Sequence, residues 1–372
     1  MESKIQLQEE EYNEASSMEK KTRIQILMEE NETCNLKPDN NENQNQNPTM
    51  KTIQLHTPLV EYEWELSQKI RAIPHTNLYF LTMISPPTPI EIGELTEDNI
   101  EKCTKHPMNK TQKQQEVEIV STTYNRKDAI PINQYLTTLK TNHSALYFMT
   151  ILDTFSQLLY AIQKIQNIND PIIIFDIHSD TILYDKKNAT PIIIDHQLAV
   201  LKSDLENPEK RRELIPNYDL PYQTIPIELW ILSNIKDEPF NQQKLFEWID
   251  QYKQNTIQNP LLTTFTEEYK LYVKDQKSWK QLEEELIKTS LTWDIFSISI
   301  IYYKMCSQML DLRTKYEFLD KWFTLLENII YSTNRPISKD IIENMNILFT
   351  TVDKELYHTF LLETLLSSDI TL

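Results

Sequence analysis

Two short segments decide the fold of this chain. They read FDIHSDTILYD at residues 175–185 and PIIIDHQLA at residues 191–199. In each segment an apolar run ends on an aspartate, Asp176 in the first and Asp195 in the second. Taken as an isolated pair, two strand-like runs that end in aspartate are ordinary strand-to-turn sequences. Their meaning therefore depends on whether the rest of the chain matches the same pattern.

The two segments resemble the catalytic loop of protein kinases, H-R-D-x-K-P-x-N-I-L, and the metal-binding segment that follows it, I-x-D-F-G-L-A. Residues 182–183 (Ile-Leu) and 198–199 (Leu-Ala) set the register. The resemblance implies that Asp176 is the catalytic aspartate, which orients the attacking hydroxyl. It also implies that Asp195 holds the magnesium ion that bridges the nucleotide phosphates.

Several positions at the same site depart from the family pattern. His178 stands where the family has a lysine that contacts the transferred phosphate, and Thr181 stands where it has a metal-ligating asparagine. Phe175 replaces the arginine that pairs with an activation-loop phosphate, and residues 196–197 (His-Gln) replace Phe-Gly. A threonine hydroxyl is a poorer ligand for a hard cation than an amide carbonyl, so we expect the second metal ion to be lost.

Three further matches follow in the order that the family has. Residues 226–228 (Pro-Ile-Glu) resemble A-P-E, residues 334–336 (Asn-Arg-Pro) resemble a late N-R-P segment, and the run that contains Asp294 resembles D-V-W-S-x-G-V-I. The resemblance implies a buried ion pair between Glu228 and Arg335, and an Asp294 side chain that ties the backbone of the catalytic loop. Alone, each of these residues is more simply a solvated charge or a helix cap.

The order of the patterns predicts an α+β fold with two lobes, like that of protein kinases. Strand-like runs and one helix precede a hinge near residues 122–131, and long helical periods follow it, the clearest between Phe148 and Ile165. We expect an acidic disordered tail at 1–21, a small strand-rich N-lobe at 22–125 and a larger helical C-lobe at 126–372. In the N-lobe we expect strands at 23–27, 49–55, 78–84 and 117–122, and a helix at 58–73.

Lys51 matches moderately well the family's lysine that holds the α- and β-phosphates. Its partner on the following helix would be Glu65 or Glu61, which lie one turn apart, and the sequence does not choose between them. A surface lysine is an equally good interpretation of Lys51.

The chain has a single glycine, Gly93. The phosphate-binding loop of the family needs glycines after its first strand, but residues 28–36 read MEENETCNL. Side chains there hold the backbone away from phosphate oxygens, and three glutamates oppose a polyphosphate. We therefore expect ATP with Mg²⁺ to bind weakly or not at all.

An insertion of about 236–288 lies between Glu228 and Asp294, and its pattern is charged and helical. Aromatic residues alternate with its charges: Phe246, Trp248, Tyr252, Tyr269, Tyr272 and Trp279. Such residues most often pack an insertion onto its domain, and the alternative is a docking surface for a protein partner.

The bulk composition excludes several classes of function. A formal net charge of -18 disfavours nucleic acid and anionic membranes as partners. The three cysteines are far apart and form no metal-binding spacing, and no apolar run has the length of a membrane span. These features fit a protein of the cytoplasm. The composition is similar to that of proteins from large DNA viruses, and if the chain is viral, the host cytoplasm or the virion is the expected location.

Four functions remain open. The first is a pseudokinase or strongly impaired kinase that works as a binding or scaffold module for a protein partner. The second is an active divergent Ser/Thr kinase that transfers the ATP γ-phosphate to protein hydroxyls. The third is a small-molecule phosphotransferase of the same superfamily, which residues Glu228, Asp294 and Arg335 disfavour. The fourth is a virion structural protein with a kinase fold.

Overall fold

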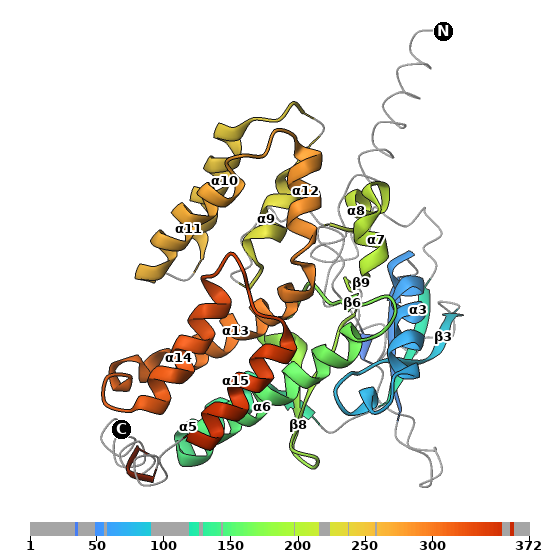
Figure 1. The fold of residues 1–372 in the computed structure, drawn as a ribbon. Helices are drawn as coiled ribbons and strands as arrows, with labels where there is room; N and C mark the ends of the chain where they lie inside the picture. The colour runs from blue at the N-terminus through green and yellow to red at the C-terminus, as the bar shows by residue number, and fades with distance from the viewer. Residues whose placement is uncertain are drawn as a thin grey trace, which may run out of the picture.

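The structure is a computed structural model of the 372-residue chain. It describes residues 34–35, 49–55, 58–90, 119–125, 129–142, 144–196, 198–215, 224–236, 238–256, 259–351 and 358–360. The predicted tail at 1–21 and the predicted strand at 23–27 lie outside the described residues. The described part is an α+β protein in which helices dominate and the sheets are small (Figure 1).

The named strands pair antiparallel in three sheets of the described residues, ordered β1-β2-β4-β3, β5-β7-β8 and β6-β9. Their bounds are β1 Cys34–Asn35, β2 Thr49–Leu55, β3 Met83–Ile90, β4 Ile119–Asn125, β5 Ala129–Pro131, β6 Ile172–Ile173, β7 Ile182–Asp185, β8 Thr190–Ile193 and β9 Val200–Leu201.

The first sheet agrees with the sequence prediction at β2 and nearly so at β4, but β3 begins five residues later than expected. A 3₁₀ helix, η1 (Thr76–Leu78), occupies the start of the predicted strand. The hydroxyl of Thr76 donates to the carbonyls of Ile70 at 2.6 Å and Ile73 at 2.8 Å, which stabilises a tight turn after the preceding helix. β3 then forms the edge of the sheet. Its prolines lack the N–H donor that a central strand needs.

Helices make up most of the remaining described chain. The α-helices are α3 Pro58–Ala72, α5 Ile132–Asn142, α6 Ser144–Gln166, α7 Lys202–Glu206, α8 Pro208–Leu214, α9 Ile227–Asn234, α10 Gln242–Asn255, α11 Pro260–Val273, α12 Trp279–Ile287, α13 Trp293–Cys306, α14 Glu317–Ile330 and α15 Ser338–Thr351; further 3₁₀ helices are η3 Ser179–Thr181, η4 Ser290–Thr292 and η5 Ser307–Leu312.

The main hydrophobic core surrounds α6, whose predicted apolar face is buried from Phe148 to Ile165. Helices α13, α14 and α15 pack their apolar faces into the same core. Leu66 and Ile70 of α3 belong to it as well, together with Phe80. The helix that follows strand β2 is therefore fixed to the helical part of the molecule by apolar contacts.

A second core lies between the strand pair β6–β9 and helices α9 to α12. Within the described residues, the range of about 236–288 for which an insertion is predicted contains the helices α10, α11 and α12. Trp248, Tyr252, Tyr269 and Trp279 are buried in this core, so they pack the insertion onto the domain. Tyr272 is the aromatic residue of this set that is exposed.

In the part of the chain that the structure describes, no helix has both the length and the apolar character that crossing a bilayer requires.

Candidate functional site

The segment that contains Asp176 begins where strand β6 ends, and its backbone turns sharply. Phe175 has a φ of 69°, in the left-handed region that costs a non-glycine residue about 1–3 kcal/mol. Asp294 stabilises this turn, because its carboxylate accepts hydrogen bonds from the N–H groups of Ile174 and Phe175 at 3.1 Å. The structure thus brings Asp294 to the loop backbone, as the resemblance implies.

Asp294 is fully buried and lies in the first turn of α13. The pKa of Asp294 is raised to about 7. Burial raises it, and this effect outweighs the hydrogen bonds from Ile174 and Phe175, which lower it. The N-terminal end of a helix also favours a negative charge.

The short helix η3 closes the loop after Asp176. The N–H of His178 donates to the hydroxyl of Thr181 at 3.0 Å, and the N–H of Asp180 donates to Nδ1 of His178 at 3.3 Å. The Thr181 hydroxyl lies 3.2 Å from the carbonyl of Asp176 and 3.1 Å from that of His178. A hydroxyl has one proton and two lone pairs, so these backbone contacts use most of the hydrogen-bonding capacity of the Thr181 side chain.

Asp176 lies near Asp195, and the charge of Asp195 raises the pKa of Asp176. Burial is the larger cause, the nearby His178 lowers the pKa, and the outcome is a value of about 6. Nε2 of His178 is 4.0 Å from Oδ2 of Asp176. Oδ1 of Asp176 is buried and, among the described residues, has no hydrogen-bond partner.

Asp195 lies two residues after the end of strand β8, has a φ of 65° and is exposed. Two carboxylates at one place form a donor set that suits Mg²⁺, which proteins commonly hold by one or two carboxylates together with phosphates and water. In the described ranges, no group of three or more His, Cys, Asp or Glu residues is arranged for a metal ion. Any cation at Asp176 and Asp195 would thus need oxygen ligands from a substrate or from water.

His196 is fully buried, although its neighbour Asp195 is exposed. Its ring lies 5.7 Å from that of Phe80, and within the described residues neither ring nitrogen has a hydrogen-bond partner of good geometry. Burial lowers its pKa to about 4, and the backbone of Leu81 raises it slightly. His196 is therefore neutral near pH 7 and packs as an aromatic ring. Gln197 lies outside the described residues.

Lys51 lies in strand β2, where its Cα pairs with that of Thr123 in β4. Only its backbone belongs to the described part of the chain. Glu65 and Glu61, the expected partners on α3, are both exposed, and the pairing of either with Lys51 stays a prediction. The buried α3 carboxylate is Glu63, which is 2 % exposed and accepts a hydrogen bond from the hydroxyl of Tyr124 at 3.2 Å.

Glu63 was not among the residues predicted from the sequence, because helical spacing alone does not tell which polar positions lie against a sheet. Val60, one turn before Glu63, is buried and packs with Met83, Trp64 and Tyr124 in a small cluster beside the first sheet. Val60 and Glu63 are three residues apart, so they lie on the same side of the helix, and this spacing was the available sequence signal. Only the position of the sheet identifies this side as buried.

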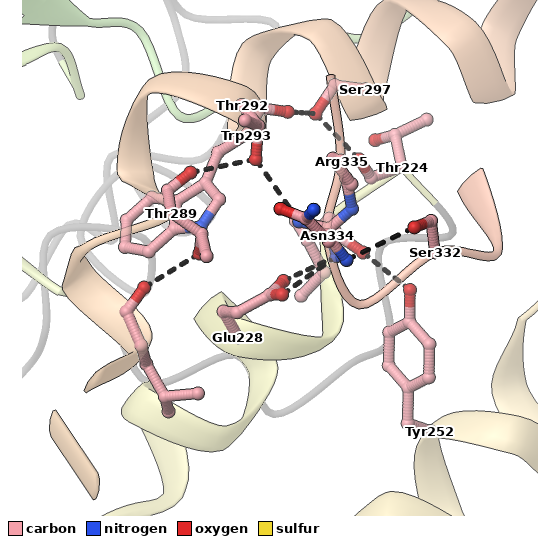
Figure 2. Close-up of polar contacts among 12 residues, drawn as sticks. Thr224, Glu228, Tyr252, Thr289, Thr292, Trp293, Ser297, Ser332, Asn334 and Arg335 are labelled. Carbon is pink, nitrogen blue, oxygen red and sulfur yellow. Dashed lines mark hydrogen bonds and ion pairs between the residues drawn. The ribbon is translucent and has the colours of Figure 1, made fainter. Parts of the chain in front are cut away.

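Glu228 and Arg335 form a buried ion pair, although they are 107 residues apart in the chain. The Nη2 atom of Arg335 is 2.7 Å from Oε2 and 2.9 Å from Oε1 of Glu228 (Figure 2). The side chains are 1 % and 2 % exposed. Burial lowers the pKa of Arg335, but the charge of Glu228 and the hydrogen bonds to it outweigh this effect, so the pKa lies above its ordinary value.

Other groups complete the surroundings of this pair. Nη1 of Arg335 is 3.3 Å from the Thr292 hydroxyl, and the guanidinium carbon lies 5.0 Å from the centre of the Phe296 ring. The hydroxyl of Tyr252, from α10, donates to the carbonyl of Ile225 at 3.0 Å, close to the ion pair (Figure 2). The ion pair thus joins α9, the segment after α14, and the region before α13.

A scan against protein-family models found no match for the chain, and a search of curated proteins found none either.

Proposed function

We propose that this protein has a bilobal, protein-kinase-like fold and that it is a pseudokinase, or a strongly impaired kinase, which serves as a binding or scaffold module for a protein partner. Support for the fold comes from contacts between distant segments that the motif resemblance implied. These are the hydrogen bonds from the loop backbone to Asp294 and the buried pair of Glu228 and Arg335.

The observation that carries the loss of catalytic power is the Thr181 hydroxyl. It hydrogen-bonds to the backbone of residues 176–178, so its oxygen is directed into the loop. A family member uses an asparagine carbonyl at this position to hold a second metal ion. Thr181 cannot supply that ligand without breaking the hydrogen bonds that close the loop. One source of charge stabilisation for the transferring phosphoryl group is thereby removed.

The composition removes a second source of charge stabilisation for the phosphoryl group, the backbone amides of a glycine-rich loop. Gly93 is the only glycine, and in the sequence it comes 57 residues after the segment 28–36, where a phosphate-binding loop is expected. Loss of one preorganised donor costs about 3–4 kcal/mol of transition-state stabilisation. Losing several donors together leaves phosphoryl transfer very slow.

A second candidate, an active divergent Ser/Thr kinase, is favoured by Asp176. Its pKa of about 6 leaves it largely ionised at pH 7 and yet basic enough to take a proton from a hydroxyl. If ATP binds, Asp195 would hold Mg²⁺, and the ion would neutralise phosphate charge. In this case His178, 4.0 Å from Asp176, would contact the transferred phosphate.

The test compares nucleotide binding and phosphate transfer in the same preparations. The purified full chain is assayed by thermal shift with ATP, with and without Mg²⁺, and then for autophosphorylation and transfer to generic acceptor proteins. Binding to the folded state raises its apparent stability, so weak binding predicts a small shift. Asp176→Ala and Asp195→Ala serve as inactive references.

Asp180→Ala is the matched control, because Asp180 lies in the same loop and its side chain is 74% exposed. We expect wild type and all three variants to incorporate phosphate at indistinguishable, near-background rates. Robust incorporation by wild type and by Asp180→Ala, abolished in Asp176→Ala and Asp195→Ala, would overturn the pseudokinase proposal in favour of the active kinase.

A further inference from the structure

The segment that follows Asp195 is folded into two short helices, α7 and α8, which lie between α12 and α3 (Figure 1). Leu205 of α7 is fully buried in the second core, and Asn207 caps α8 by accepting hydrogen bonds from the N–H groups of Glu209 and Lys210. The segment is thus a packed structure with its own capping interactions, and its two ends carry polar contacts to different helices.

One contact joins α8 to the insertion. Arg211 is 3 % exposed and forms an ion pair through Nη2 with Glu283 of α12, which is 6 % exposed. Nη1 of the same guanidinium donates to the carbonyl of Leu205 at 2.9 Å. Arg211 therefore fixes α8 to α12 and to the end of α7 at the same time. Removing one partner of such a pair leaves the other charge buried and uncompensated, so a variant that lacks one partner should loosen the contact between α8 and α12.

The other contact joins α7 to α3. The Tyr62 hydroxyl donates to Oδ2 of Asp204 at 3.0 Å and accepts from the N–H of Leu201 at 3.3 Å. Oδ1 of Asp204 is 2.6 Å from Nζ of Lys210, so the same carboxylate joins α7 to α8. Tyr62 lies in the N-terminal half of α3, whereas Leu66 and Ile70, which anchor α3 in the main core, lie in its C-terminal half.

We propose that residues 201–214 act as a clasp that couples the insertion to α3: the Arg211–Glu283 pair holds α7 and α8 in place, and α7 then holds the N-terminal half of α3 through Asp204 and Tyr62. This half of α3 carries Glu63, the residue after Tyr62. A change at α12 thereby alters the position of the buried Glu63 carboxylate on α3, and no direct contact between α12 and α3 is needed. The inference concerns coupling between elements and does not depend on phosphoryl transfer.

The clasp is tested on the full chain by amide hydrogen exchange with mass spectrometry, followed in peptides from residues 58–65. Tyr62→Phe removes one hydroxyl and should speed exchange in 58–65 about fivefold, the change expected from loss of one ordinary hydrogen bond. Glu283→Gln should speed exchange in α7 and α8 and also in 58–65.

A double-mutant cycle separates coupling from general loosening. In the Tyr62→Phe background, Glu283→Gln should add no further acceleration in 58–65, because its route to α3 is already cut. Glu284→Gln is the matched control, because Glu284 lies on the same helix and its side chain is 59% exposed; it should leave all three helices unchanged.

Two results would overturn the clasp. Either Glu283→Gln speeds exchange in α7 and α8 and leaves 58–65 as in wild type, or its effect on 58–65 is equally large with and without the Tyr62 hydroxyl. If Glu283→Gln lowers the yield of folded protein, Arg211→Lys takes its place with the same expectations, since lysine keeps the charge and loses the second guanidinium contact to Leu205.

Discussion

At the scale of single residues, the buried carboxylate of Asp176 lowers the stability of the folded protein, although the same group is suited to a chemical role. Its carboxylate is partly desolvated, lies near Asp195, and has a buried oxygen without a hydrogen-bond partner among the described residues. A group chosen only for stability would not be a carboxylate here. Perturbed acids of this kind gather at functional sites more often than elsewhere.

This conflict predicts a pH-dependent gain from Asp176→Asn. The pKa of Asp176 is raised from 3.8 to about 6 on folding, so its favourable contribution is complete below about pH 4 and is lost as the pH rises through about 6. At pH 7.5 the variant should be more stable than wild type by roughly 2–3 kcal/mol, and at pH 4 this gain should disappear.

Urea unfolding of both proteins at pH 4, 5, 6 and 7.5 measures the difference. Asp180→Asn, at an exposed position of the same loop, is the control and should bring no gain of this size at pH 7.5. A difference between wild type and Asp176→Asn that does not change with pH would contradict the buried, ionised carboxylate.

Residue-scale predictions from sequence succeeded where a motif fixes the position and failed where only helical spacing was available. Asp176 lies near Asp195, and Glu228 pairs separately with Arg335, so the structure shows both of these neighbouring pairs. Glu65 does not face inward and Glu63 does, because the buried side of α3 is set by strands β3 and β4, which come later in the chain.

At the scale of elements, the Glu228–Arg335 pair joins α9 to the segment between α14 and α15 (Figure 2). Glu228→Gln or Arg335→Met alone should lower the free energy of unfolding by about 3–5 kcal/mol, because each leaves a buried charge without its partner. The double variant should cost less than the sum of the two, since no uncompensated charge remains.

Denaturant unfolding of the two single variants and the double variant gives these values. The matched control is Glu317→Ala, which breaks the pair of Glu317 and Lys321 at 2.8 Å on the surface, where the side chains are 74% and 44% exposed. That change should cost less than about 1 kcal/mol. Equal effects of the buried and the exposed substitutions would contradict the role assigned to the buried pair.

Helices were easier to predict than strand boundaries. The apolar period of α6 extends over several turns, and each turn repeats the same signal. Strand β3 was placed five residues early because the run from Leu78 to Ile84 is apolar, and its first part forms η1 and a bridge from Phe80 to Ile193 instead of a strand. Such short apolar runs are ambiguous until their neighbours are known.

At the scale of the whole molecule, α3 shares one continuous core with α6, α13 and α14. This arrangement predicts that the described parts unfold together. Ile70→Ala should lower stability by about 2–5 kcal/mol and shift the far-UV circular dichroism and tryptophan fluorescence transitions by the same amount, because Trp293 and Trp322 report on the helical part.

Lys69→Ala, at the exposed neighbouring position of α3, is the control and should shift neither transition appreciably. Two separate transitions, of which Ile70→Ala moves only one, would show that the core is divided in two.

The sequence by itself determined the α+β class, the apolar runs that form β6 and β8 before the two aspartates, and the buried face of α6, because these depend on residues close together in the chain and on periods that repeat. It also determined the shortage of glycine. The tertiary structure decided which glutamate of α3 is buried, that the Thr181 hydroxyl is used within its own loop, and that α7 and α8 join α12 to α3. The contacts of Tyr62 with Asp204 and of Arg211 with Glu283 cross 142 and 72 residues, and no local pattern specifies which distant side chains will meet when the cores pack.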